Sequence, residues 1–308
     1  MSLGRLRARY EAHEIEKHPY LQQMHDLHRA LHDYASYLPS TDISRIEIAD
    51  GEVVMTTRSS GLRFVVEPSD QRTAPVEILN FGSYEGIDGE MMLALVADGD
   101  VVFDVGANIG YYSMRIARER SRTVVHSFEP IPKTFGLLQR HLGMNAITNV
   151  TAHNVGLSDK PGPQTFYYYP QGSGNASAAN LSGRPDVQRV TVELETLDAI
   201  AAKVGRGVDF VKCDVEGAEL FTLRGARETL VRDRPALFVE LLRKWAAPFG
   251  YHPNDVIALL EGIGYHTFVS RVAGRLAEFG RVDDQTVETN YVFLHPSRHQ
   301  AVIDRLVD

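Results

Sequence analysis

The chain has only one cysteine, Cys213, among its 308 residues, so a disulfide framework is excluded. Chains without disulfides are typical of reducing compartments, and we therefore expect a cytoplasmic protein. No apolar run approaches the ~18 residues that a membrane-crossing helix needs. The N-terminus is also too polar for a secretory signal peptide. The sequence thus predicts a protein with no membrane span.

An excess of positive charge is absent as well. The chain has 32 basic and 40 acidic residues, which gives a net charge of −8. Nucleic-acid binding relies on a basic face that neutralises phosphates, so no nucleic acid is expected as a partner. The 44% of hydrophobic and 23% of charged residues are ordinary for a globular enzyme. The length is sufficient to bury a sizeable core.

Residues 1–75 form an accessory region in our interpretation. Apolar residues recur in steps of three and four over residues 19–39, which predicts an amphipathic helix. Residues 43–67 alternate around Asp50-Gly51, which predicts a β-hairpin and a third strand. Three histidines on the helix have a spacing that would suit a metal, but no acid or cysteine completes the set. They also mark a candidate homodimer contact: His25, His28 and His32.

Residues 76–308 are predicted to form one α/β domain. VVFDV at 101–105 is a buried strand, and a glycine turn and an amphipathic helix follow it. A Gly/Ser/Asn-rich insertion at 165–188 is expected to be a mobile loop over the pocket. The last two strands have no helix between them, which favours an antiparallel hairpin at the sheet edge. The other strands are expected at 123–130, 150–158, 209–217, 236–242, 265–272 and 286–295.

This order of elements distinguishes two fold classes. A parallel sheet that ends in an antiparallel hairpin is the pattern of class I methyltransferases, which are Rossmann-like. A dehydrogenase would instead continue with a crossover helix and a second parallel half. The first pattern fits the sequence better.

The turn after the first strand indicates the cofactor. Its spacing is DxGxNxG, and Asn108 replaces a glycine of the dinucleotide-binding pattern GxGxxG. Glu129 ends the next strand, 23 residues after Gly106, where an acid can accept both hydroxyls of a ribose. Asp104 lies in a buried strand and needs a partner. It would repel a pyrophosphate but suits the α-ammonium of S-adenosylmethionine, which is therefore favoured over NAD.

Four segments, DVGANIGYYS, SFEP, NVGLSD and DFVKCDVEGAEL, resemble the FkbM-type S-adenosylmethionine-dependent methyltransferases. The likeness covers roughly residues 80–295, and KxDxEGxE is its most specific part. It implies methyl transfer to a hydroxyl of a sugar or other small natural product. It also implies that the turn holds the methionine part, that Glu129 holds the ribose and that residues 154–156 flank the adenine. The implied cofactor-binding residues are Asp104, Gly106, Asn108, Gly110, Tyr111, Tyr112, Glu129, Asn154, Val155 and Asp214.

Charged residues gather at the ends of the fourth and fifth predicted strands, where open α/β sheets bind ligands. An alkyl hydroxyl needs a base or a metal before it can attack a methyl group. We expect Asp214, Glu216 and Glu240 to activate the hydroxyl, with Lys212 beside them. Asp214 and Glu240 are also a candidate pair of Mg²⁺ ligands, a layout similar to catechol-type methyltransferases. For Glu216, helix capping is the alternative.

Other possibilities stay open. Family members tend to carry Tyr-Glu before the first strand, which makes Glu85 a candidate pocket residue, whereas pairing with an arginine is its structural alternative. His266 is an alternative base. An NAD-binding oxidoreductase is disfavoured by Asn108 and the terminal hairpin. A catalytically silent methyltransferase-like partner protein is disfavoured by the acidic cluster. The sequence does not indicate the acceptor.

Overall fold

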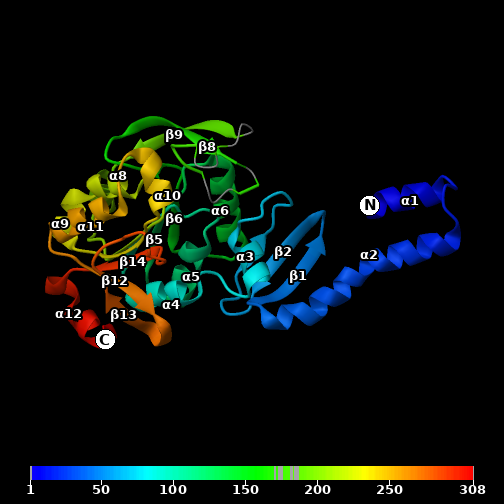
Figure 1. Ribbon diagram of the computed structural model, residues 1–308, viewed down its shortest axis with the longest axis horizontal. Helices are drawn as coiled ribbons and strands as arrows, with labels where there is room; N and C mark the ends of the chain where they lie inside the picture. The colour runs from blue at the N-terminus through cyan, green and yellow to red at the C-terminus, as the bar shows by residue number, and fades with distance from the viewer. Residues whose placement is uncertain (1, 170, 173–175, 181–182, 184–186, 308) are drawn as a thin grey trace.

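The computed structural model describes residues 2–169, 171–172, 176–180, 183 and 187–307. An eight-stranded sheet of order β13-β12-β14-β11-β10-β4-β5-β6 forms its centre (Figure 1). The segment from β6 to β11 is parallel, and β14 lies antiparallel between β11 and β12. The strands are β4 (Val101–Val105), β5 (Val124–Phe128), β6 (Val150–His153), β10 (Phe210–Cys213), β11 (Ala236–Glu240), β12 (His266–Arg271), β13 (Arg275–Glu278) and β14 (Asn290–Leu294).

Helices cover both faces of this sheet because its strands are apolar on both sides, as in other parallel sheets. One face packs against a core cluster that contains Leu197, Leu220 and Val256. Its helices are α7 (Leu197–Val204), α8 (Glu219–Arg224), α9 (Arg227–Asp233) and α11 (Pro253–Glu261). The other face packs against a second cluster with Met92 and Ile116. Its helices are α3 (Ala74–Phe81), α4 (Gly86–Leu95), α5 (Tyr111–Glu119), α6 (Pro132–Met144) and α12 (Pro296–Leu306).

The N-terminal region contains the predicted strands and helix. β1 (Ile43–Ala49), β2 (Glu52–Thr57) and β3 (Arg63–Val65) form an antiparallel sheet. Phe64 and its neighbours on this sheet share the second core cluster, which fixes the sheet to the body. α1 (Leu3–Glu11) and α2 (Lys17–Tyr37) form an arm that extends away from the body (Figure 1).

A second small sheet contains part of the predicted insertion. Its order is β7 (Gly156–Leu157), β9 (Gln188–Glu195) and β8 (Gly162–Tyr168). Tyr167 and Tyr168 are therefore sheet residues. Much of the Gly/Ser/Asn-rich part, for which a mobile loop was predicted, lies outside the described residues. Ser177 within it is buried, and its hydroxyl donates to the Glu216 carbonyl oxygen at 2.8 Å.

The C-terminal end differs from the prediction in one respect. The final strand β14 is not at the sheet edge but between β11 and β12, and an unpredicted strand, β13, forms the edge. No helix in the described part of the chain is long and apolar enough to cross a membrane. Within that part, His25, His28 and His32 do not form a metal-binding group.

Candidate active site

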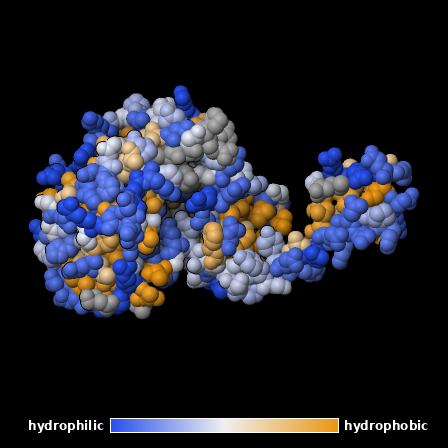
Figure 2. All heavy atoms as spheres, in the orientation of Figure 1, coloured by the Kyte–Doolittle hydropathy of each residue, from blue (hydrophilic) through white to orange (hydrophobic). Residues whose placement is uncertain are grey.

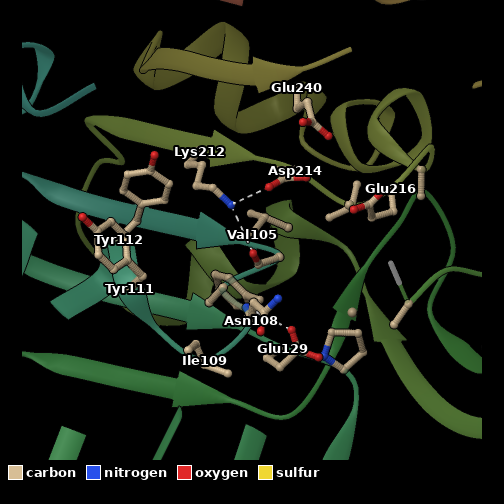
Figure 3. Close-up of a pocket in the computed structure, with 18 of the residues that line it drawn as sticks. Val105, Asn108, Ile109, Tyr111, Tyr112, Glu129, Lys212, Asp214, Glu216 and Glu240 are labelled. Carbon is tan, nitrogen blue, oxygen red and sulfur yellow. Dashed lines mark hydrogen bonds and ion pairs between the residues drawn. The ribbon is translucent and has the colours of Figure 1, made fainter. Parts of the chain in front are cut away.

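A cavity lies at the carboxyl ends of β4, β5, β10 and β11, the place where ligands bind in open α/β sheets (Figure 3). The glycine turn and Glu129 form one side of it, and Asp214, Glu216 and Glu240 belong to another. The remaining lining residues are Arg72, Ala74, Tyr84, Glu85, Val105, Ala107, Ile109, Tyr111, Tyr112, Phe128, Pro130, Gly156, Leu157, Phe166, Ala176, Lys212, Val215 and Ala218.

The turn after β4 brings backbone into the cavity. Gly106 has φ +79, a left-handed conformation that glycine adopts without steric cost. A Cβ at Gly106 would lie 1.7 Å from the Asp214 carbonyl oxygen, so β4 and β10 approach too closely for any side chain there. Asn108 also has a positive φ, and its side-chain Oδ1 is buried without a hydrogen-bond partner in the described structure.

Glu129 follows β5 and lies across the turn. One carboxylate oxygen accepts from the Asn108 backbone N–H at 3.1 Å, and the other accepts from the Ile131 N–H at 2.8 Å. Asn154 steadies this segment, since its Nδ2 donates to the carbonyl oxygens of Glu129 and Pro130. Burial raises the pKa of Glu129 to about 7. Unpaired Asn108 Oδ1 and buried Glu129 would both accept from hydroxyl or ammonium donors, so they fit a nucleoside cofactor.

The raised pKa of Glu129 predicts a pH effect on stability. Between about pH 4.5 and 7 the folded state keeps a proton that the unfolded chain has released. Glu129 therefore stabilises the fold less as pH rises through this window, by about 3 kcal/mol as an order of magnitude. Urea unfolding of wild type and Glu129→Gln from pH 5 to 8 measures this effect. The stability of wild type relative to the variant should fall with pH, and a constant or rising difference contradicts the assignment.

Lys212 on β10 connects the two sides of the cavity. Its ammonium lies 3.5 Å from Asp104, 3.3 Å from Asp214 and 3.1 Å from the Gly106 carbonyl oxygen. Burial opposes the charge, but Asp214 and Asp104 raise the pKa of Lys212. Lys212 therefore stays a cation and cannot serve as a base. It neutralises two carboxylates and holds the turn against β10.

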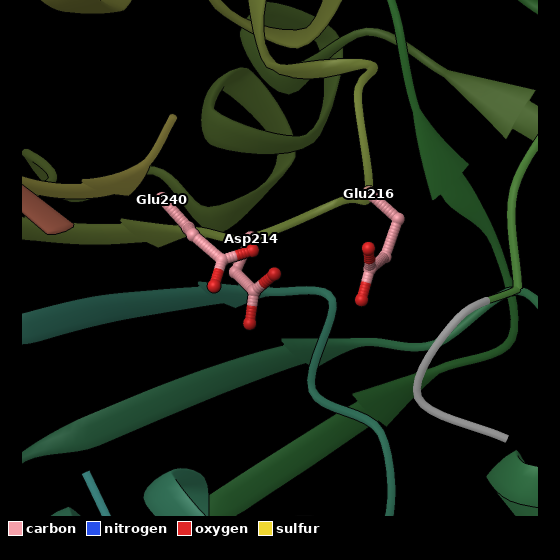
Figure 4. A group of neighbouring side chains, drawn as sticks. All are labelled: Asp214, Glu216 and Glu240. Atoms are coloured by element: carbon pink, nitrogen blue, oxygen red, sulfur yellow. The ribbon is translucent and has the colours of Figure 1, made fainter. Parts of the chain in front are cut away.

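Three carboxyl groups meet beyond Lys212. One oxygen each from Asp214, Glu216 and Glu240 lie within 4.8 Å of one another (Figure 4). Burial, and then the charge of Asp214, raises the pKa of both Glu216 and Glu240 well above the usual range. Glu85, which pairs with the Tyr112 hydroxyl, also lines the cavity, and burial with Asp214 raises its pKa to about 7. Buried carboxyl groups with raised pKa values are candidates for exchanging a proton with a bound acceptor.

Several residues considered as candidates lie outside the cavity lining. Asp104 is buried behind it, bound by Lys212 and the Ser113 hydroxyl. Gly110 is the N-cap of α5, and a Cβ there would meet Leu138. Three further residues are absent from the lining: Asn154, Val155 and His266, which is exposed on β12. Glu216 does not cap α8, which has no side-chain cap hydrogen bond, and Glu219 instead accepts from the N–H groups of Val215 and Gly217 in the loop before the helix.

Some lining residues were not among the sequence candidates. Arg72 comes from the segment before α3, Ala74 is the first residue of α3, and Phe166 and Ala176 come from the insertion. Tyr84 packs edge-on against Tyr111, with ring centroids 5.0 Å apart. Among these lining residues, only Tyr84 belongs to a sequence motif, the Tyr-Glu pair before β4. The positions of the other lining residues depend on the packing of segments that are far apart in the sequence.

The strand order, the glycine turn and the acid after β5 together define a Rossmann-like fold of the methyltransferase class. The chain belongs to the family described as the Methyltransferase FkbM domain, whose pattern matches residues 104–267. Membership of this methyltransferase family implies S-adenosylmethionine as the cofactor. This confirms the family resemblance, the fold class and the cofactor that the sequence indicated.

Three curated relatives illustrate the range of the family. Methyltransferase sdnD of Sordaria araneosa is 30% identical over 205 residues, which is 56% of this chain and 76% of that protein. The 31-O-demethyl-FK506 methyltransferase FkbM of Streptomyces tacrolimicus is 30% identical over 151 residues, 47% and 54% of the two chains. Hexuronic acid methyltransferase AglP of Haloferax volcanii is 25% identical over 182 residues, 59% and 70%. The matches span three fifths or less of several relatives.

Proposed function

We propose that this protein transfers a methyl group to a hydroxyl of a sugar or other small natural product. One observation carries the proposal: a single cavity has the glycine turn and Glu129 on one side and three carboxyl groups on the other. Two relatives support the acceptor class, since their names specify an O-demethyl natural product and a hexuronic acid.

One side of the cavity fits the cofactor. S-adenosylmethionine, when bound, supplies an electrophilic methyl group. Glu129 is the proposed acceptor for the ribose hydroxyls, and Asn108 and the backbone of Gly106 hold the amino-acid end. Asp104 acts from behind the cavity wall, because its contacts are with Lys212 and Ser113. Tyr111 and Tyr112 line the cavity next to the turn and exclude water from it.

The acidic cluster is the proposed activating group. Asp214 is fixed by its ion pair with Lys212, and Glu240 and Glu216 share the same space. An acceptor hydroxyl among them donates a hydrogen bond to a carboxylate. When the hydroxyl oxygen bonds to the methyl carbon and the bond from that carbon to sulfur breaks, S-adenosylhomocysteine would leave and the hydroxyl proton would pass to a carboxylate oxygen of Asp214 or Glu240. Much of the rate acceleration that proton transfer does not supply comes from holding the reacting atoms in line.

A metal-assisted version of the same step uses the same residues. Carboxylate oxygens are the ligands that Mg²⁺ prefers, and the spacing of Asp214, Glu216 and Glu240 suits one ion. The ion would bind the hydroxyl and lower its pKa, so that a weaker base could remove the proton. Burial, and after it the charge of Asp214, raises the pKa of Glu216 and of Glu240, and a bound cation would offset the repulsion among the three carboxylates.

Binding and turnover together test the proposed function. Calorimetric titration with S-adenosylhomocysteine and with NAD should give binding of the first only, which removes the NAD-binding oxidoreductase. A panel of hydroxylated sugars and natural products is then assayed for methyl transfer from labelled S-adenosylmethionine. Transfer to an acceptor oxygen supports the proposal. Tight cofactor binding without transfer to any hydroxyl would favour a catalytically silent partner protein.

A further inference from the structure

The arm formed by α1 and α2 has a long uncovered side. α2 contains 21 residues and buries none of them, although apolar side chains recur along it. α1 has 9 residues and packs beside the first half of α2, where the Tyr10 and Tyr20 rings stack at 4.3 Å and Leu6 is buried. The second half of α2 lies bare between α1 and the body (Figure 1). An exposed apolar stripe on a helix implies a partner surface.

The space beside this bare half is here called the opening. Its floor is α2, and the start of α1 and the tip of the β1–β2 hairpin stand on its two sides (Figures 1 and 2). Figure 2 shows hydrophobic surface on both sides of it. Five apolar side chains of α1, α2 and β1, the elements that border it, are exposed by 38% to 69%: Leu3, Leu27, Leu31, Tyr34 and Ile48.

The dimensions of the opening limit what fits. At 1.5 Å per residue α2 is roughly 32 Å long and α1 roughly 14 Å, so roughly 18 Å of α2 is bare. A helix with its side chains is about 10–12 Å wide. One helix therefore fits, but a pair of helices side by side does not. The bare half of α2 is a single helix, because α1 packs only beside the first half, and it therefore has the width that fits the opening.

We propose that the occupant is a second copy of this chain, with the two α2 helices crossing near Leu31. Each bare half then lies in the opening of the other copy, around a two-fold axis, which makes the contact self-complementary. With roughly 200 Å² for each large apolar side chain, the five residues offer about 500 Å² per copy. Since interfaces are roughly 60% apolar, the dimer buries roughly 1,600 Å² in total, the size of a standard stable interface.

The charged residues of α2 are consistent with a contact through the side of the helix that carries Leu31. Asp26, Arg29 and Asp33 lie on the side of the helix opposite Leu31, because 100° separates successive residues. They remain in solvent when Leu31 is covered. The inference does not depend on the proposed methyl acceptor, and it gives the exposed histidine-bearing helix a role that the active site does not use.

The test measures association of the full chain. In sedimentation velocity across a concentration series, wild type should be a dimer. Leu31→Glu should raise the dimer dissociation constant at least about 100-fold, because both copies then bury an unpaired charge at the crossing. Gln22→Glu places the same charge nine residues away, on the opposite side of α2, and should leave the dimer intact. Since α2 is not buried in the body, thermal melting of the body should be equal in all three proteins.

A cross-link locates the contact independently. Cys213 is buried, so a cysteine introduced on α2 is the accessible thiol. At the proposed two-fold axis Leu31→Cys should form an intermolecular disulfide on mild oxidation, whereas Gln22→Cys should not. A monomeric wild type at every concentration would overturn the proposal, and so would a dimer that Leu31→Glu leaves unchanged. Either result would point to a different partner for α2.

Discussion

Replacing Asp214 by asparagine is expected to lower kcat by about 10²- to 10⁴-fold, the range for loss of a positioned base. Asparagine keeps the size of the side chain but cannot accept the hydroxyl proton or pair as an anion with Lys212. Asp214 also pairs with Lys212 and has a carboxylate oxygen within 4.8 Å of one oxygen each of Glu216 and Glu240. Single-turnover methyl transfer with an identified acceptor measures the effect.

Two controls separate this role from a structural one. Glu193→Gln removes an exposed carboxylate from β9, outside the cavity lining, and should leave kcat unchanged. The affinity of Asp214→Asn for S-adenosylhomocysteine should stay close to that of wild type. If affinity falls as far as kcat, Asp214 acts mainly on the cofactor, as its place among the predicted cofactor-binding residues allows.

The same assay distinguishes the two versions of the activation step. With a bound divalent ion, EDTA should abolish turnover, and added Mg²⁺ should restore it. With direct base catalysis, EDTA should have no effect, while Glu240→Ala still lowers kcat because Glu240 shares the space around Asp214. Full activity of Asp214→Ala and of Glu240→Ala, together with resistance to EDTA, would exclude both versions.

The site was predictable where its residues lie in one motif at a strand end. Asp214 and Glu216 are two residues apart at the end of β10, and the parallel order places Glu240 on the neighbouring strand. Asp104 shows the limit of that reasoning. Its burial required a partner, and the strand register sets Asp104 opposite Lys212, so one partner comes from the protein itself. Sequence alternation alone does not give that register.

The parallel part of the fold was predictable from local sequence patterns. The prediction of the C-terminal strands was incomplete. Apolar runs and glycine turns indicated the parallel strands, because those strands are buried on both faces. The position of β14 inside the sheet depends on pairing between distant strands, which the local pattern does not encode. β13 is four residues long, and its polar RLAE sequence lacks a strand signal. The wall with Arg72 and Phe166 depends on packing of segments far apart in the chain.

Gly106→Ala is expected to cause the largest loss of stability and to abolish cofactor binding. The new methyl group would lie 1.7 Å from the Asp214 carbonyl oxygen, and the left-handed backbone at φ +79 adds roughly 1–2 kcal/mol of strain. Backbone atoms cannot rotate away as a side chain can, so β4 and β10 must separate. That movement would break the contact between Lys212 and the Gly106 carbonyl oxygen and displace Asp214.

Two other glycines give a graded comparison for Gly106. Gly205 has φ +69, and a methyl group added there would have no atom within 4 Å, so Gly205→Ala reports the backbone strain alone. Gly110 has φ +88, and its Cβ would meet the flexible Leu138 side chain at 2.3 Å. Thermal melting should therefore rank the losses as Gly106→Ala, then Gly110→Ala, then Gly205→Ala. Gly205→Ala should also keep its affinity for S-adenosylhomocysteine. Equal losses for Gly106→Ala and Gly205→Ala would mean that β4 and β10 do not approach as closely as the turn requires, and the cofactor side of the cavity would then need another geometry.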